Sequence, residues 1–148
     1  MTATAATARP TLGHTLLRGL PGRTPLRLSC RMAVWVGATA IAASALIHLH
    51  LWFGGYRHIH LIGPAFLLQV LVGTVTALAL VAFTRVVTVL AGAAYCLGSA
   101  VALILSATVG FLGLHDGLSV PWATASLTIE LAGGAVLLGC LPLMLRAR

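Results

Sequence analysis

The chain has 148 residues, of which 59% are hydrophobic and only 7% are charged. This length leaves room for one domain, and so apolar a composition excludes an additional water-soluble catalytic domain outside the apolar segments. The net charge of +7 comes from nine arginines without any lysine, and no folded basic face with interleaved aromatic residues accompanies them, which argues against nucleic-acid binding.

Residues 1–31 are rich in Thr, Ala, Gly, Pro and Arg and show little periodicity, which predicts a flexible cytoplasmic tail. The rest of the chain, residues 32–148, contains four long apolar segments. Each reaches or exceeds the roughly 20 residues that cross a hydrocarbon core about 30 Å thick. We therefore predict an all-α, multi-pass membrane domain with transmembrane helices at about 32–53, 59–83, 86–113 and 120–145.

The links between these segments are short, which predicts an up-and-down bundle of four helices. Five arginines precede the first segment, two end the sequence and Arg85 lies in the second link, whereas Arg57 alone falls on the other side. Because positive residues accumulate on the cytoplasmic side, both termini are expected there. The preference for Ala, Gly, Leu, Val and Arg is typical of a GC-rich bacterial genome, and the expected location is the plasma membrane.

Small residues at four-residue spacing mark the faces on which membrane helices pack closely. Each predicted helix has such a stripe, and the stripes also carry most of the polar residues of the segments. Their members are Ala40, Ser44 and His48; Gln69, Gly73 and Ala77; Ala94, Gly98, Ala102, Ser106 and Gly110; and Ser126, Glu130 and Gly134.

Glu130 is the one carboxylate deep in a predicted span, roughly 15 Å below its outer end at 1.5 Å per residue. Gln69 and Ser44 fall at a similar depth and His48 about one turn higher, and with Ser106 they form a predicted polar cluster in the bundle. Such a carboxylate is costly in hydrocarbon and usually marks function. One hypothesis is an acid that carries a proton or binds a ligand beside His48 and Gln69. The other is a neutral acid that bonds Gln69 or Ser44 and fixes the packing.

Four histidines surround the first outer link: His48, His50, His58 and His60. Imidazole is a ligand for zinc, copper, nickel and haem iron. Residues two apart diverge by about 200° on a helix, so a site would pair one histidine from each side, such as His48 with His60. Solvated interfacial histidines are the alternative. No cofactor is predicted, and haem or a metal ion at these residues is kept as an alternative.

Arg57 and Asp116 are the lone outer arginine and the lone outer acid. They predict a salt bridge between the two outer loops, which in an exposed pair contributes about 0–1 kcal/mol. The alternative is a contact of Tyr56 and Arg57 with an anion or a lipid headgroup.

The first hairpin also carries a resemblance. Its residues are His48, Trp52, Gly55-Tyr56-Arg57, Ile59, Ile62-Gly63-Pro64 and Phe66-Leu67-Leu68. The chain resembles small actinobacterial integral membrane proteins of unassigned function, which have four spans, short loops and an Arg-rich cytoplasmic tail. The resemblance implies a fold and a location but no reaction. Many of those proteins have proline at the position of His60. A more distant similarity to DoxX-like four-helix membrane proteins rests on topology alone.

Three functional hypotheses follow. The first is a non-enzymatic structural or accessory bundle in the lipid bilayer, as a homo-oligomer or in a larger membrane complex, because motifs for phosphate binding, serine nucleophiles and metalloproteases are absent from the sequence. The second is a proton-coupled carrier that uses Glu130, His48 and Gln69, although four helices without an internal repeat form a small pathway unless the protein oligomerises. The third is a redox membrane subunit that binds haem or a metal through the outer histidines.

Overall fold

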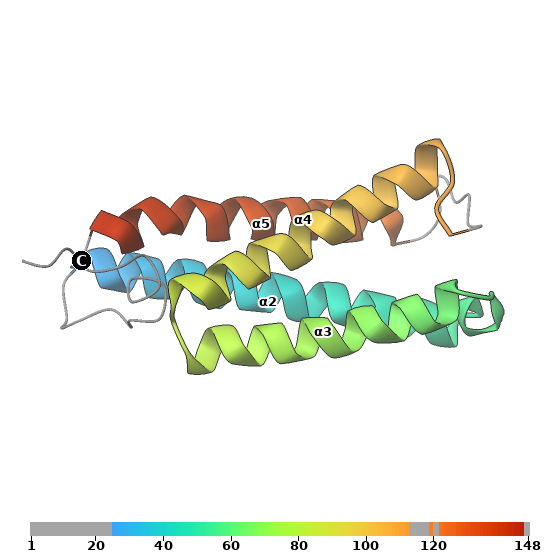
Figure 1. Cartoon of the computed structure of the whole chain (residues 1–148), viewed down its shortest axis with the longest axis horizontal. Coiled ribbons are helices and arrows are strands. Elements are labelled where there is room, and N and C mark those ends of the chain that lie inside the picture. The colour runs from blue at the N-terminus through green and yellow to red at the C-terminus, as the bar shows by residue number, and fades with distance from the viewer. Residues whose placement is uncertain (1–24, 113–118, 120–121, 147–148) are drawn as a thin grey trace, which may run out of the picture.

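The computed structural model describes residues 25–112, 119 and 122–146. Four of its helices are long and apolar enough to cross a membrane: α2 (Pro25–Phe53), α3 (Ile62–Ala82), α4 (Val86–Thr108) and α5 (Ala123–Arg146). A short 3-10 helix, η1 (Tyr56–His58), connects α2 to α3. Successive long helices run antiparallel, so that α2 begins and α5 ends at the same end of the bundle (Figure 1). We call this the terminal end and the opposite one the η1 end.

The helix bounds differ from the predicted spans where the backbone turns. Helix α2 begins at Pro25, so residues 25–31, which were predicted as part of the tail, are helical. Helix α4 ends at Thr108, five residues before the predicted 113. Gly110 and Leu112 have φ of 84° and 51°, which an α-helix does not allow. Hydropathy alone cannot locate this end, because the residues after Thr108 are as apolar as those before it.

Tight packing characterises the terminal half of the bundle, where Leu137 of α5 lies between α2 and α4. A Cβ atom on Gly37 of α2 would come within 2.5 Å of the Leu137 side chain, and one on Gly92 of α4 within 2.9 Å. Both positions therefore need glycine for Leu137 to fit. The fully buried large apolar residues are Val34, Ile41, Leu80, Val89, Leu137 and Met144, with Cys30 and Cys96 beside them.

The predicted small-residue stripes coincide with buried positions better on α2, α3 and α5 than on α4. Gly73 and Ala77 of α3 are buried, as are Ser126, Glu130 and Gly134 of α5, and Ser44 of α2. On α4, Ala94 and Gly98 are exposed, whereas Ser106 is buried, so the predicted stripe follows the packed face only in part. The buried face of α4 also carries Gly92, Ala93, Cys96 and Ala100. Small residues occupy both faces of this helix, and lipid tolerates them as readily as a neighbouring helix does.

Helices α3 and α4 contact each other less than the other neighbouring pairs do. They lie close together near the terminal end and diverge toward the η1 end (Figure 1). Helix α2 keeps its contacts with both α3 and α5. The bundle is therefore more open at the η1 end, on the side of α3 and α4.

The first hairpin closes the η1 end of α2 and α3. Gly63 packs directly against η1, since a Cβ at this position would lie 2.6 Å from the carbonyl oxygen of Arg57. The backbone N–H of Gly63 donates to the carbonyl of Ile59 at 3.0 Å. The ring of Tyr56 stacks on that of Phe66 in α3, with centroids 5.2 Å apart. These contacts fix η1 to the first turns of α3.

Candidate functional site

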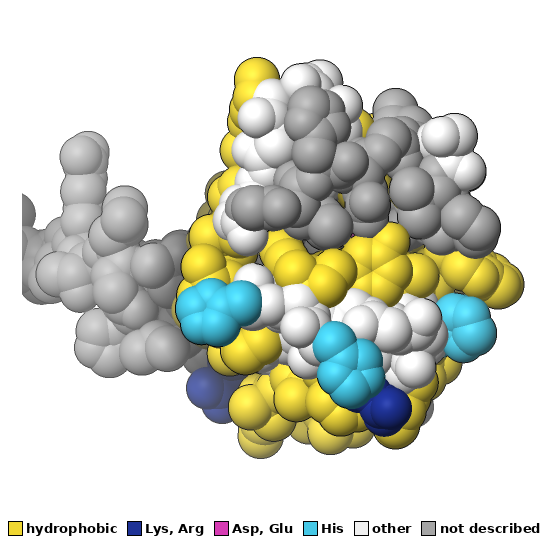
Figure 2. Space-filling model, turned by 90° about the vertical axis from the view of Figure 1, so that its right-hand side faces the viewer, with side chains coloured by type: hydrophobic (Ala, Val, Ile, Leu, Met, Phe, Trp, Pro, Cys, Tyr) yellow, Lys and Arg dark blue, Asp and Glu magenta, His cyan; other side chains and the backbone are white. Residues whose placement is uncertain are grey.

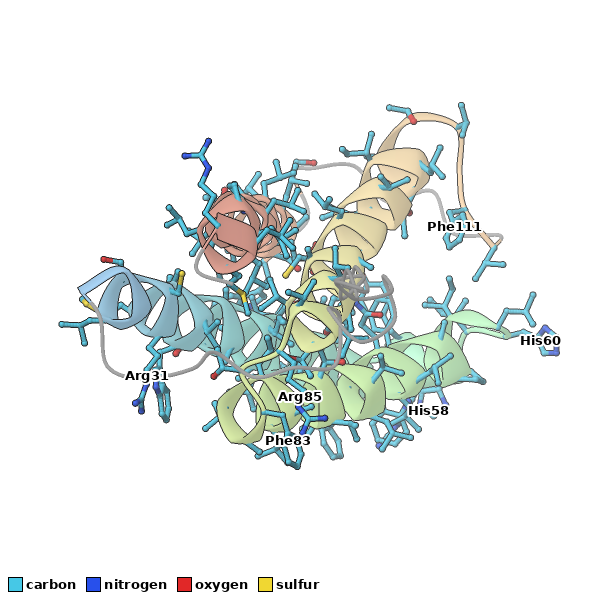
Figure 3. The ribbon with its side chains drawn as sticks, turned by 60° about the vertical axis from the view of Figure 1, so that its left-hand side comes forward. Arg31, His58, His60, Phe83, Arg85 and Phe111 are labelled. Atoms are coloured by element: carbon cyan, nitrogen blue, oxygen red, sulfur yellow. The ribbon has the colours of Figure 1, made fainter. Side chains whose placement is uncertain are left out.

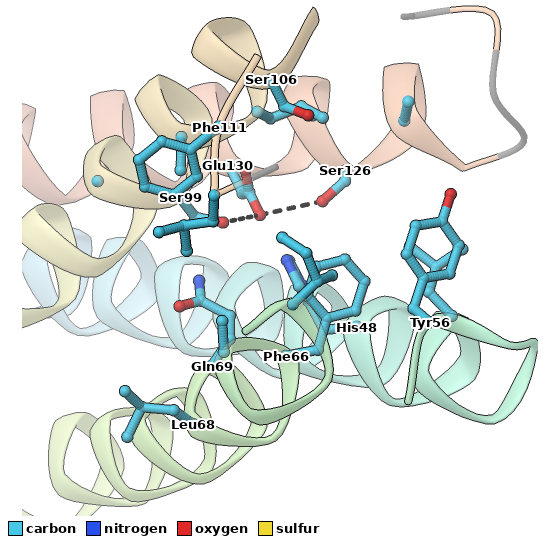
Figure 4. A pocket seen from close by; sticks show the side chains of 18 of the residues that line it. His48, Tyr56, Phe66, Leu68, Gln69, Ser99, Ser106, Phe111, Ser126 and Glu130 are labelled. Atoms are coloured by element: carbon cyan, nitrogen blue, oxygen red, sulfur yellow. Dashed lines mark hydrogen bonds between the residues drawn. The ribbon is translucent and has the colours of Figure 1, made fainter. Parts of the chain in front are cut away.

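Glu130 is fully buried in α5, and one of its carboxylate oxygens accepts three serine hydroxyls. Ser44 of α2 donates to Oε1 at 2.6 Å, Ser99 of α4 at 2.7 Å and Ser126, one turn away on α5, at 3.0 Å. The bonds to Ser99 and Ser126 are drawn in Figure 4. Glu130 Oε1 thus connects three of the four long helices.

The second carboxylate oxygen, Oε2, is buried without a hydrogen-bond partner among the described residues. The side-chain nitrogen Nε2 of Gln69, on the fourth helix α3, is in the same situation. Most buried side-chain polar atoms have at least one partner, and an unpartnered one costs free energy. An acceptor on α5 and a donor on α3 are therefore both left available.

Both residues line one cavity of about 280 Å³ near the η1 end. Figure 4 shows Gln69 and His48 on the opposite side of it from Glu130 and Ser99. Leu68 of α3 and Gly98 of α4 also line the cavity and are exposed. The cavity therefore reaches the surface of the bundle between α3 and α4, where these two helices diverge.

His48 contributes a further polar atom to the lining. Its Nδ1 lies 2.9 Å from the carbonyl oxygen of Ser44, one turn earlier in α2. Since a carbonyl oxygen can only accept, Nδ1 carries the hydrogen and Nε2 is the acceptor of the neutral ring. The imidazole ring and the Phe66 ring pack in a T-shaped arrangement with their centroids 5.1 Å apart, which holds the imidazole in place.

Aromatic rings form much of the remaining wall. Tyr56 and Phe66 stack on one side, and Phe111 and Trp122 line the cavity from the segments after α4 and before α5. The rest of the lining is mostly aliphatic. The described lining contains one carboxylate, Glu130, and neither lysine nor arginine. An apolar cavity with a few convergent polar groups is the usual form of a small-molecule site.

The structure brings the predicted polar cluster together around this cavity. Gln69, His48, Ser106 and Glu130 line it, and Ser44 bonds Glu130 directly. Ser99 lies beside the predicted α4 stripe and did not emerge from the sequence as a site residue. The four-residue spacing placed its neighbour Gly98 on the packed face. Because adjacent helix residues point in different directions, Ser99 was then not considered for that face. Ser126 was recognised only as a packing residue, although its spacing of four from Glu130 indicates a bond along the helix.

The outer histidines do not converge. His50, His58 and His60 are exposed, and histidine side chains are spread over the η1 end (Figure 2). His58 and His60 lie apart from each other in Figure 3. No three His, Cys, Asp or Glu side chains within residues 25–112, 119 and 122–146 gather as a metal-binding group. A haem or metal ion bound by these histidines stays an alternative to the prediction of no cofactor.

The predicted pairing of Arg57 with Asp116 lies partly outside the described residues, since Asp116 falls there. Arg57 is exposed, and its Nε donates to Nε2 of His58 at 2.9 Å. Its guanidinium lies 6.0 Å from the ring centroid of Trp52. Tyr56, in contrast, contributes to the cavity wall. The two residues of the predicted headgroup contact thus have different surroundings.

Together these features define an all-helical bundle with four membrane-length helices and a buried polar site beside an apolar cavity. Comparisons with protein-family models, with curated proteins and with solved structures gave no match for this sequence. The resemblance to actinobacterial four-span proteins stays a prediction.

Proposed function

We propose that this protein is a proton-linked carrier of a small amphiphilic solute, with Glu130 as the proton-carrying acid. The observation that carries the proposal is that Oε2 of Glu130 and Nε2 of Gln69 line one cavity and have no hydrogen-bond partner within the described part of the chain. An ionisable residue facing a cavity inside a membrane bundle is typical of substrate and proton pathways.

A purely structural or accessory bundle is the competing hypothesis. The three serine bonds to Oε1 suit it, since they hold α2, α4 and α5 together. A packing role needs neither a cavity of about 280 Å³ nor two buried polar atoms without partners. Both features weaken a stable bundle, because voids and unsatisfied polar groups cost free energy. They therefore support a site that a solute completes.

In the proposed cycle, a proton occupies Oε2 while the cavity is empty, and the solute replaces it there. Binding of the solute and binding of the proton at the same oxygen then exclude each other. The serines hold the carboxyl group through Oε1 in both states, and they keep Oε2 directed to the cavity. Competition for one atom thus links binding of the solute to release of the proton.

The test is whether Glu130 exchanges its proton with water. Infrared difference spectra of the full chain in lipid vesicles, recorded in steps between about pH 5 and about pH 9, report the carbonyl stretch of a protonated carboxyl group. We expect a titrating band that shifts in D₂O and disappears in Glu130→Gln. The matched control, Thr128→Val, changes an exposed residue of the same helix and leaves the band in place.

A second variant keeps the test independent of the folding of Glu130→Gln. Ser99→Ala removes one hydroxyl donor from Oε1 and retains the carboxyl group, so the band should persist at a shifted frequency. A spectrum without any titrating band that depends on Glu130 would overturn the proposal and leave the structural hypothesis in its place.

A further inference from the structure

We infer that the solute is a small amphiphilic organic cation, an ammonium ion with at least one N–H, whose charged nitrogen binds Oε2 of Glu130 and whose apolar body lies against the aromatic wall. This inference rests on the proposed function and names the chemical class of its solute.

The charge of the site carries the first step. Glu130 is the one carboxylate in the described lining, and that lining offers neither lysine nor arginine to pair with it. A buried carboxylate is strongly stabilised by a cation that donates a hydrogen bond to it. Anionic solutes are disfavoured, because the described lining offers neither lysine nor arginine to pair with their charge in a low-dielectric cavity. The missing partner of Oε2 is thus best supplied by a cationic donor.

The aromatic wall carries the second step. Phe66 and Tyr56 stack on one side of the cavity, and Trp122 and Phe111 line it from the other segments. Aromatic faces attract organic cations, most strongly where water is excluded. The same rings also bury an apolar body. At about 280 Å³ the cavity is at the lower limit of ordinary ligand sites, which suits a solute with one ring or a short branched chain.

Two more polar atoms refine the solute class. Nε2 of His48 is the acceptor of its neutral ring and takes a second N–H of the ammonium ion. Nε2 of Gln69 is a donor without a partner, which a hydroxyl or carbonyl oxygen on the solute would satisfy. The preferred solute is therefore an amine that carries one oxygen acceptor near its nitrogen.

The exchange balances in charge. An ammonium ion enters, the proton on Oε2 leaves to water, and the site holds a neutral ion pair in place of a neutral acid. Among the described residues, the other titratable groups near Glu130 are His48 of α2, Tyr95 and Cys96 of α4, and Tyr56 of η1. Helix α3 contributes Gln69, which does not titrate. Proton release that disappears when Glu130 alone is changed identifies Glu130 as its source.

The experiment is calorimetric titration of the full chain in mild detergent, in two buffers with different ionisation heats, which also counts released protons. The probes share one shape: phenethylamine, 2-phenylethanol as the neutral isostere and phenylacetate as the anion. We expect phenethylamine to bind roughly tenfold or more tightly than 2-phenylethanol, with release of about one proton, and phenylacetate not to bind. Protein-free micelles correct for partition into detergent.

Variants assign the contributions. Glu130→Gln should remove both the preference for the amine and the proton release, whereas Thr128→Val should leave both unchanged. A further probe, 2-amino-1-phenylethanol, adds a hydroxyl group to phenethylamine, and the unaltered chain should bind it more tightly because Gln69 can donate to that oxygen. Gln69→Leu should abolish this difference but keep the preference for the amine over the alcohol. Equal binding of amine and alcohol by the unaltered chain, or amine binding that survives in Glu130→Gln, overturns the inference.

These outcomes separate the inference from the proposed function. A titrating Glu130 band without a preference for the amine leaves the carrier in place and rejects the cation as its solute. Absence of the band rejects the carrier itself.

Discussion

Ser44 Oγ and Glu130 Oε1 lie 2.6 Å apart across the contact between α2 and α5, although 86 positions separate the two residues in the sequence. This bond joins the first and last described helices at the depth of the cavity. The neighbouring carbonyl of Ser44 also holds His48, so the same turn of α2 positions two groups of the site.

Replacement of Ser44 by alanine should lower the free energy of unfolding by about 1 kcal/mol, because a buried hydrogen bond to Glu130 is lost. Unfolding in mixed micelles by increasing denaturing detergent measures the change. In the Glu130→Ala background, which offers no acceptor to the Ser44 hydroxyl, the loss should differ, since the two residues are coupled. Equal losses in both backgrounds would show that the bond contributes nothing.

Gly63→Ala should destabilise the first hairpin by about 1–3 kcal/mol, because the new methyl group overlaps the carbonyl of Arg57. Its Cβ would lie 2.6 Å from that oxygen, which belongs to backbone and cannot rotate away. The control is Gly139→Ala, where nothing lies within 4 Å of the added atom. Thermal unfolding of both variants measures the loss of stability. A Gly63→Ala variant as stable as the unaltered chain would contradict the close approach of η1 to α3.

Leu137→Ala should cost about 2–5 kcal/mol, since it leaves a void between Gly37 and Gly92 in the most tightly packed region. The adjacent Leu138 is 41% exposed, and Leu138→Ala should have a much smaller effect. Because Leu137 does not line the cavity, the infrared band of Glu130 should persist in this variant wherever it folds. Similar losses for both leucines would contradict the described packing.

The predicted orientation can be checked with His60→Cys, because His60 is exposed at the η1 end. The native thiols of Cys30, Cys96 and Cys140 are buried, so the folded chain should give little background labelling. With both termini in the cytoplasm, a membrane-impermeant maleimide should label His60→Cys from outside intact cells. Labelling only after the membrane is made permeable would show that the η1 end lies in the cytoplasm, opposite to the predicted orientation. Arg146→Cys, at the terminal end, is the matched reciprocal variant.

Much of the architecture was predictable because apolar length and short links determine helix number and order in a membrane bundle. The depth count also placed Ser44 and Gln69 level with Glu130, and the structure brings these residues to one site. Helix ends were less predictable. Helix α2 begins at Pro25, in a polar segment where hydropathy does not predict a membrane helix.

The packed face of α4 was predicted only in part: Ser106 is buried, but Ala94 and Gly98 are exposed. Gly98 and Ser99 are adjacent, and four-residue spacing of small residues selected Gly98 for the packed face. Which of two small-residue faces meets a partner depends on the crossing of α4 over its neighbours, and that tertiary relationship leaves no local signal. The cavity was unpredictable for the same reason, since it results from the divergence of α3 and α4.

The exposed Leu68 and Gly98 at the mouth of the cavity have a consequence for access. Both lie within helices long enough to cross a membrane, so in a bilayer this opening would face hydrocarbon, whereas the exposed Leu112 and Trp122 line the cavity beside the link between α4 and α5. An amphiphilic amine that dissolves in the bilayer would then enter sideways from the lipid phase. Its local concentration is set by its partition between water and lipid, and the apparent affinity in vesicles should rise with the lipophilicity of the probe even where the contacts with Glu130 are the same.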